Sequence, residues 1–183
     1  NAEGSTISIF KNTSIAGTID ANSFAAKIDF NSGRYPSGLA IGDLDGDNKI
    51  DIAVTNYGSS SVSVLKNKIT NSIINPDSFA PKVDFTTGNG PNGVAMGDLD
   101  GDGKLDLAVA NANFIVGGDL TRTISVLRNT STMGEISASS FAPKVDYSVG
   151  TNPMSIVIAD FDGDSKPDLA VTNNNSNTIS VLW

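Results

Sequence analysis

The chain has 183 residues, enough for one domain with a substantial core. Its 20 acidic and 12 basic residues give a formal net charge of −8, which argues against a surface built to bind nucleic-acid phosphates. The sequence contains no histidine and no cysteine, which excludes histidine catalysis, disulfides and the nitrogen or sulfur ligands that zinc and copper prefer.

The first 30 residues contain two predicted strands. The segment TISIFKN (6–12) alternates apolar with polar residues, which is typical of a half-exposed strand. The segment SFAAKIDF (23–30) returns twice later in the chain, as SFAPKVDF and SFAPKVDY. In both later copies a proline favours an edge strand.

The rest of the chain repeats a longer pattern three times. In each copy, small and aliphatic residues lead into an acidic loop, and an apolar, β-branched segment and an alternating segment follow it. The acidic loops begin at Asp43, Asp98 and Asp160. The first two starts are 55 positions apart, and the third follows after 62, because the middle copy has seven extra residues between Asn111 and Thr123. This regular spacing indicates an internal repeat array.

Each full copy predicts four short antiparallel strands joined by turns rich in Gly, Asn and Pro. Short strands repeated at this period are typical of the blades of a β-propeller. We therefore predict an all-β fold in which residues 1–183 form a single repeat array. Its divisions are 1–30, the tail of a preceding blade; 31–86, the first blade; 87–148, the second; and 149–183, a third blade that lacks its last strand.

The three acidic loops share the pattern Asp-x-Asp-Gly-Asp-x-x-x-Asp and hold twelve of the 20 acidic residues. Because the first three aspartates alternate with other residues, a tight loop can direct their carboxylates toward one point. The glycine at the fourth position (Gly46, Gly101, Gly163) permits the sharp turn. Oxygen ligands in this number favour Ca²⁺, which takes about six to eight of them. Because crowded carboxylates repel one another, we expect each loop to be ordered only with its ion. Three divalent ions would reduce the formal net charge from −8 to −2.

Two other interpretations of the acidic loops are weaker. Asp and Gly are ordinary residues of solvated turns, but three copies in one register are not expected of ordinary turns. A helix-loop-helix calcium hand needs flanking helices and a glutamate at the twelfth position. The segments IAVTN and LAVAN that follow the first two loops are strand-like, and that glutamate is missing.

The segment VAMGDLDGDGKLDLAVAN (94–111), followed by ISVLRN (124–129), resembles the FG-GAP or VCBS-type repeat, the blade unit of integrin-α-like propellers. The resemblance spans essentially the whole chain. It implies four-stranded blades in which a calcium loop joins the first and second strands. It also implies three Ca²⁺ sites, each formed by four aspartates and one lysine backbone carbonyl. The implied ligands are Asp43, Asp45, Asp47, Lys49 and Asp51; Asp98, Asp100, Asp102, Lys104 and Asp106; and Asp160, Asp162, Asp164, Lys166 and Asp168. Pro167 departs from the pattern of the other copies and restricts Lys166 to extended conformations, so we expect a slightly different third site.

Three blades do not close a ring, since propellers typically have about four to eight. Both ends of the chain interrupt a blade, which leaves strand edges without partners. We expect the missing strands to come from the rest of a longer chain or from other copies of this one, in a ring or a head-to-tail fibre. By itself the chain should then oligomerise or be poorly stable.

A second set of residues is a candidate ligand surface on the face opposite the acidic loops. It comprises Arg34 and Tyr35 before the first acidic loop, and Phe114, Ile115, Val116 and Arg122 in the longer segment of the middle copy. Loops on rigid scaffolds often carry binding residues. The alternative is a longer hairpin that packs its own apolar residues on the blade.

We expect a calcium-stabilised binding or adhesion module, secreted or on the cell surface, for protein or carbohydrate ligands. The alternatives are an accessory propeller of a secreted carbohydrate-active enzyme and a subunit of a self-assembling fibre. We expect no catalysis, because every closely spaced set of carboxylates lies in a calcium loop, and Asp29, Asp84 and Asp146 occupy one repeated structural position. No apolar stretch approaches 18 residues, so we expect no membrane insertion.

Overall fold

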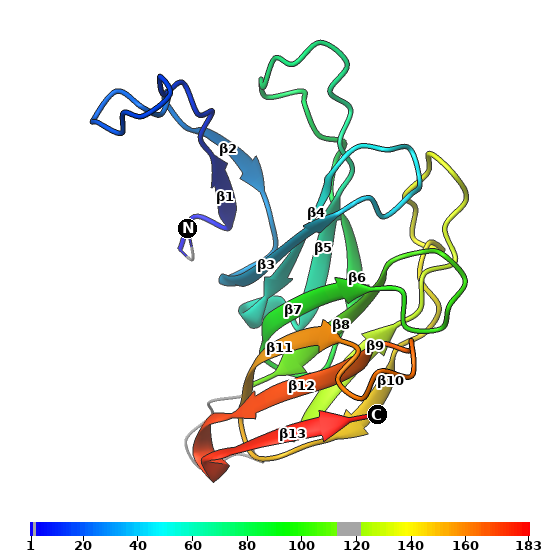
Figure 1. Ribbon diagram of the computed structural model, residues 1–183. Helices are drawn as coiled ribbons and strands as arrows, with labels where there is room; N and C mark the ends of the chain where they lie inside the picture. The colour runs from blue at the N-terminus through cyan, green and yellow to red at the C-terminus, as the bar shows by residue number, and fades with distance from the viewer. Residues whose placement is uncertain (2, 113–121) are drawn as a thin grey trace.

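A computed structural model describes residues 1, 3–112 and 122–183 of the chain (Figure 1). The described residues form thirteen β-strands and two short 3-10 helices, η1 (Tyr57–Ser59) and η2 (Asn174–Ser176). Every strand pairing among them is antiparallel, so the predicted all-β class is confirmed. Within these residues, no helix has the length and apolar character that crossing a membrane requires.

The strands form four separate sheets, and in each sheet the neighbours in space are also neighbours in sequence. The first sheet contains β1 (Thr6–Ile9) and β2 (Ile28–Asn31). The second contains β3 (Pro36–Gly42), β4 (Asp51–Asn56), β5 (Ser61–Leu65) and β6 (Val83–Thr86). The third contains β7 (Pro91–Gly97), β8 (Asp106–Asn111), β9 (Thr123–Leu127) and β10 (Val145–Ser148). The fourth contains β11 (Pro153–Ala159), β12 (Asp168–Asn173) and β13 (Thr178–Leu182).

The first strands of the second, third and fourth sheets lie side by side, with β7 packed between β3 and β11. The small residues of these segments permit this close approach. A Cβ added at Gly38 would collide with the Asn92 carbonyl oxygen, and one at Gly93 would lie 2.6 Å from the Met154 carbonyl oxygen. Four-stranded antiparallel sheets side by side are the predicted propeller-like blades, and within the described residues no sheet closes on itself (Figure 1).

The hydrophobic core lies in layers between neighbouring sheets. Strand β4 is buried along its whole length and contributes to two layers, with Ala53 on one side and Ile52 and Val54 on the other. Strand β8 is also fully buried and contributes Leu107 and Val109 to one layer and Ala108 to the next. This double burial explains why these segments read as continuous apolar runs, since a strand covered on both faces has no solvent-facing positions.

The repeated acids outside the loops hold strand pairs together. Asp146 accepts a hydrogen bond from Ser125 Oγ at 2.7 Å and pairs with Lys144. Asp84 and Asp29 make the same serine and lysine contacts in the two preceding sheets. These contacts give the repeated position a structural role at the last strand of each of the first three sheets.

Candidate metal centre

Each acidic loop connects the first strand of a sheet to the second, and the three loops lie along one side of the molecule (Figure 1). The loop begins directly after the first strand, and its last aspartate is the first residue of the second strand. In the second sheet, for example, Gly42 at the end of β3 pairs with Asp51 at the start of β4. Strand pairing therefore brings the two ends of the loop, and their carboxylates, together.

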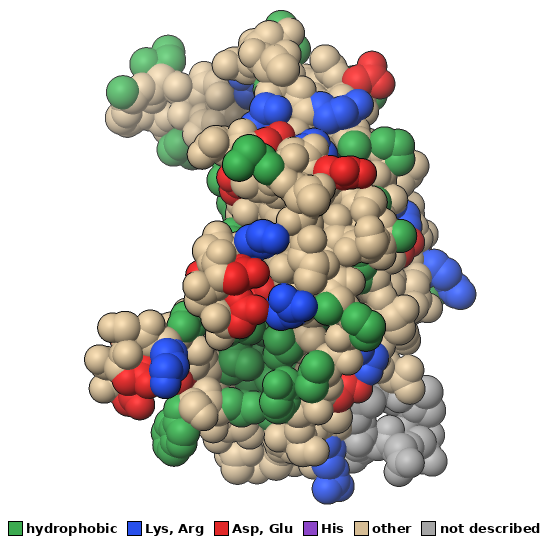
Figure 2. Space-filling view, turned by 90° about the vertical axis from the view of Figure 1, so that its right-hand side faces the viewer, with side chains coloured by type: hydrophobic (Ala, Val, Ile, Leu, Met, Phe, Trp, Pro, Cys, Tyr) green, Lys and Arg blue, Asp and Glu red, His purple; other side chains and the backbone are tan. Residues whose placement is uncertain are grey.

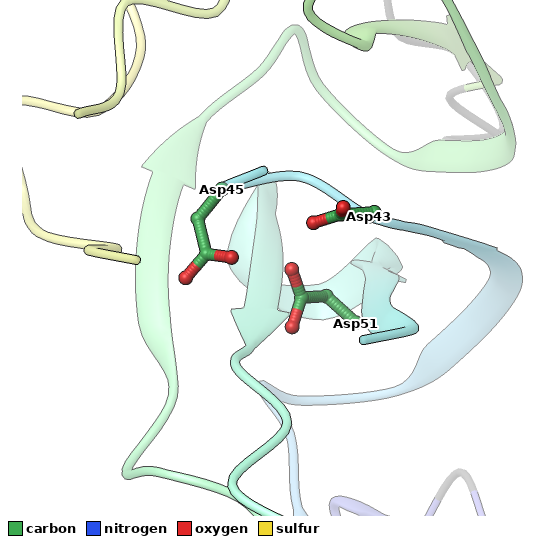
Figure 3. A group of neighbouring side chains, drawn as sticks. All are labelled: Asp43, Asp45 and Asp51. Atoms are coloured by element: carbon green, nitrogen blue, oxygen red, sulfur yellow. The ribbon is translucent and has the colours of Figure 1, made fainter. Parts of the chain in front are cut away.

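Three of the four aspartates in each loop form a cluster. Carboxylate oxygens of Asp43, Asp45 and Asp51 lie within 4.8 Å of one another and point toward a common space (Figure 3). The same positions cluster in the second and third loops. Their members are Asp98, Asp100 and Asp106, and Asp160, Asp162 and Asp168.

The fifth residue of each pattern lies outside its cluster. The Asp47 carboxylate instead accepts a hydrogen bond from the Lys49 backbone N–H at 3.0 Å. Asp102 and Asp164 accept the equivalent bonds from Lys104 and Lys166, at 2.9 and 2.8 Å. The lysines whose carbonyls the resemblance implies as ligands are thus each tied to the fifth aspartate through their amides.

The first aspartate shapes each loop by accepting backbone hydrogen bonds. Asp43 Oδ1 accepts from Gly46 N and Asp43 Oδ2 from Asn48 N, both at 2.8 Å. Gly46 has a φ of 73°, a left-handed conformation that is costly for most other residues. The second and third loops repeat these bonds on Asp98 and Asp160.

The last aspartate of the first and second loops is buried and carries a raised pKa. Asp51 is 0% exposed and Asp106 is 1% exposed. Burial is the main cause of the raised pKa, and the negative charges of neighbouring aspartates add to it. Two backbone amides oppose the rise at each residue, those of Asn67 and Leu44 for Asp51. A buried carboxylate that is costly to ionise beside two others would be stabilised by a bound cation.

The oxygen sets fit a hard divalent cation. A calcium ion binds oxygen at about 2.4 Å, so two ligands of one ion lie at most about 4.8 Å apart. The carboxylate oxygens of each cluster lie within 4.8 Å of one another, which is compatible with that spacing in all three loops. Since the donors are carboxylate oxygens without nitrogen or sulfur, they suit calcium or magnesium better than zinc or copper.

Lys66 enters the first loop from the segment that follows β5. Its ammonium group pairs with the carboxylates of Asp45 and Asp47. Burial by itself would lower the Lys66 pKa, but the two aspartates outweigh burial and hold the pKa above its usual value. Burial would likewise raise the Asp47 pKa, and hydrogen bonds from Lys66 and Lys49 lower it instead. Sequence reasoning missed Lys66, although the repeat register marks its position: Arg128 and Trp183 follow the equivalent strands β9 and β13.

Acidic side chains do not cover the surface evenly. On the face shown in Figure 2 they gather in small groups next to basic side chains, and apolar side chains line a hollow between two such groups. This distribution agrees with the concentration of charge in the three loops.

The candidate ligand residues lie away from the clusters. Arg34 and Tyr35 precede β3, whereas Asp43 follows it, so about seven strand residues, or roughly 23 Å, separate them. The Arg34 guanidinium lies 5.7 Å from the centre of the Tyr35 ring. Arg122 is exposed directly before β9. The other three candidates, Phe114, Ile115 and Val116, lie outside the described residues.

Two family models match the chain. A model described as FG-GAP-like repeat matches residues 43–109, and one described as FG-GAP repeat matches residues 152–182. The chain belongs to the FG-GAP repeat family. The two matches contain all three acidic loops, and they confirm the resemblance predicted from the sequence. A comparison of this FG-GAP repeat protein with curated proteins found no match. Together with the four-stranded sheets, the family indicates a β-propeller-type module.

Proposed function

We propose that this chain is a calcium-stabilised extracellular module, built of propeller blades, that binds a protein or carbohydrate ligand and performs no catalysis. The main support for calcium binding is that the same three-carboxylate cluster recurs at the same place in three sheets. The family match supports an extracellular module, because FG-GAP repeats are typical of such proteins.

The stabilising role follows from what each cluster connects. Asp51 accepts hydrogen bonds from Leu44 N within the loop and from Asn67 N in the segment after β5. The Asp51 carboxylate thus links three parts of the sheet: the acidic loop, the second strand and the segment that follows the third strand. Bound calcium would supply the positive charge that a buried carboxylate at this junction lacks. Free calcium at about ten times the dissociation constant would add roughly 1.4 kcal/mol of stability at each site.

The ligand-binding part rests on the turns at the opposite end of the strands. Tyr35 has a φ of 52° and is 46% exposed, and its carbonyl accepts a hydrogen bond from Tyr57 N. The turn is therefore held by η1 while its aromatic ring faces solvent. Exposed aromatic and arginine side chains on a rigid turn favour contact with a ligand.

A second candidate function is assembly with a further blade. The outer face of the fourth sheet exposes apolar side chains, among them Ile179 at 70% and Val181 at 41%. An apolar sheet face of this kind favours contact with another blade, from the same polypeptide or from another copy. Light scattering tests this candidate: we expect mass to rise with protein concentration, and a stable monomer at all concentrations would contradict it.

Calorimetry on the full chain tests calcium binding. Titration of calcium chloride into chelator-treated protein should show three sites, and added calcium should raise the melting temperature. Asp106→Asn should remove one site and leave two, because the three clusters share no residue. Asp77→Asn, which removes the same charge from an exposed acid outside the loops, should keep all three. Absence of any calcium-dependent shift, or loss of all three sites with Asp106→Asn, would contradict the proposal.

A further inference from the structure

The three acidic loops differ in the residue that follows the third strand of their sheet. This residue is Lys66 after β5, Arg128 after β9 and Trp183 after β13. Because the last aspartate of each loop begins the neighbouring second strand, the residue after the third strand lies beside the loop. The repeat therefore places a different side chain next to otherwise similar clusters.

At the first loop this residue is Lys66, whose ammonium group donates hydrogen bonds to three acceptors. Lys66 Nζ donates to Asp45 Oδ2, to Asp47 Oδ2 at 3.1 Å and to the Gly134 carbonyl oxygen at 2.8 Å. The Lys66 side chain is 19% exposed and that of Asp45 is 0% exposed, so solvent screens the contact with Asp45 only weakly. Asp45 is a member of the cluster.

Among the described residues, the other two loops have no comparably buried ion pair at the cluster. Arg128 approaches Asp100 only to 3.9 Å, and its side chain is 55% exposed. Trp183 is uncharged, and among the described residues no basic side chain pairs with Asp162. The protein itself therefore neutralises part of the first cluster's charge through a close, buried ion pair, whereas the second cluster has only the long, exposed contact with Arg128.

We propose that the Lys66 ammonium group is a resident counter-ion that holds the first loop without metal and weakens its calcium binding relative to the other two loops. A cation that binds Asp45 must displace the ammonium group from two carboxylates and from the Gly134 carbonyl. Those bonds are lost on calcium binding, whereas loops without the ammonium group lose none. This inference rests on the proposed calcium binding of the loops.

The test isolates the first loop within the full chain. Asp106→Asn and Asp168→Asn together remove the last aspartate of the other two clusters, and calcium chloride is then titrated calorimetrically with and without Lys66→Met. Methionine keeps an unbranched side chain but has no charge. We expect Lys66→Met to tighten calcium binding about tenfold, because charge-assisted hydrogen bonds no longer oppose it. Without calcium, the same change should lower the melting temperature. Lys68→Met, an exposed lysine two residues away, is the matched control and should change neither quantity.

The direction of the change separates this role from a structural one. Damage to the loop would weaken calcium binding, whereas removal of a competing cation tightens it. Unchanged or weaker binding by Lys66→Met, in a chain whose other loops bind calcium, would overturn the inference alone. A wild-type chain that binds no calcium at any loop would overturn the proposed function as well.

Discussion

The first and third acidic loops share a motif and a backbone but have different surroundings. In both, the first aspartate accepts bonds from the fourth and sixth residues of the motif. The second residue differs most: Leu44 is 1% exposed and Phe161 is 53% exposed. The motif thus determines the local geometry of each loop, whereas the segments packed against the loop determine its burial and its charge.

A connection from the next sheet covers the first loop. Asn129 Nδ2 and Ser131 Oγ both donate to the Leu44 carbonyl, at 2.8 and 3.1 Å, and Gly134 N donates to the Asp45 carbonyl at 2.8 Å. This segment joins β9 to β10, far along the chain from the loop that it covers. Among the described residues, no equivalent bonds reach the carbonyls of Phe161 or Asp162. The buried loop should therefore respond more strongly than the open one to the same substitution.

The largest expected difference concerns the last aspartate of each motif. Asp51→Ala should lower the free energy of unfolding of the calcium-free chain by about 2–4 kcal/mol, because one buried and one part-buried backbone amide lose their acceptor. Asp168→Ala should cost about 1–2 kcal/mol, because Asp168 accepts one such bond, from Phe161 N. Urea unfolding in the presence of chelator measures both. Equal losses would show that burial of the first loop has no energetic consequence.

A smaller effect should follow when the cover itself is weakened. Asn129 is 0% exposed and bonds both Leu44 O and Leu105 O. Asn129→Ala should cost about 1–3 kcal/mol and make the first loop behave like the third. Hydrogen exchange should then accelerate over residues 43–51 and remain unchanged over residues 160–168. Asn12→Ala, at the equivalent position after β1, is the control and should leave exchange unchanged in both loops, because its side chain accepts a hydrogen bond from Ser14 N, outside the acidic loops. Equal acceleration in both loops would contradict the assigned cover.

The smallest expected effect is a pH dependence at the outer strands. Burial opposes ionisation of Asp146, but Lys144 and Ser125 outweigh it and lower the Asp146 pKa below 3.8. The stabilisation is therefore present above that value and lost as the pH falls through the lower, folded-state pKa. Partial exposure should keep it below about 1 kcal/mol. Asp146→Asn should remove this part of the acid dependence of unfolding, and an unchanged pH profile would contradict the account.

Much of the fold follows from the sequence because the repeat is local. Continuous apolar segments such as DIAVTN and spaced aspartates predict buried strands and tight loops from neighbouring residues alone. The family match confirms the repeat. The position of Asp47 outside the cluster could not be predicted from the sequence, since it depends on the amide of Lys49 and on the ammonium group of Lys66. The burial of the first loop did not follow either, because Gly134 is 89 residues from Asp45 in sequence.

A crystal structure of the chain grown with limiting calcium tests the central claim most directly. Anomalous difference density should locate an ion in each acidic loop, bound by the first, third and ninth aspartates of the motif. Occupancy should be lowest in the first loop, where the Lys66 ammonium group holds Asp45. The same map would show whether Asp47 and the Lys49 carbonyl join the site. Density absent from all three loops, or highest in the first, would contradict the account.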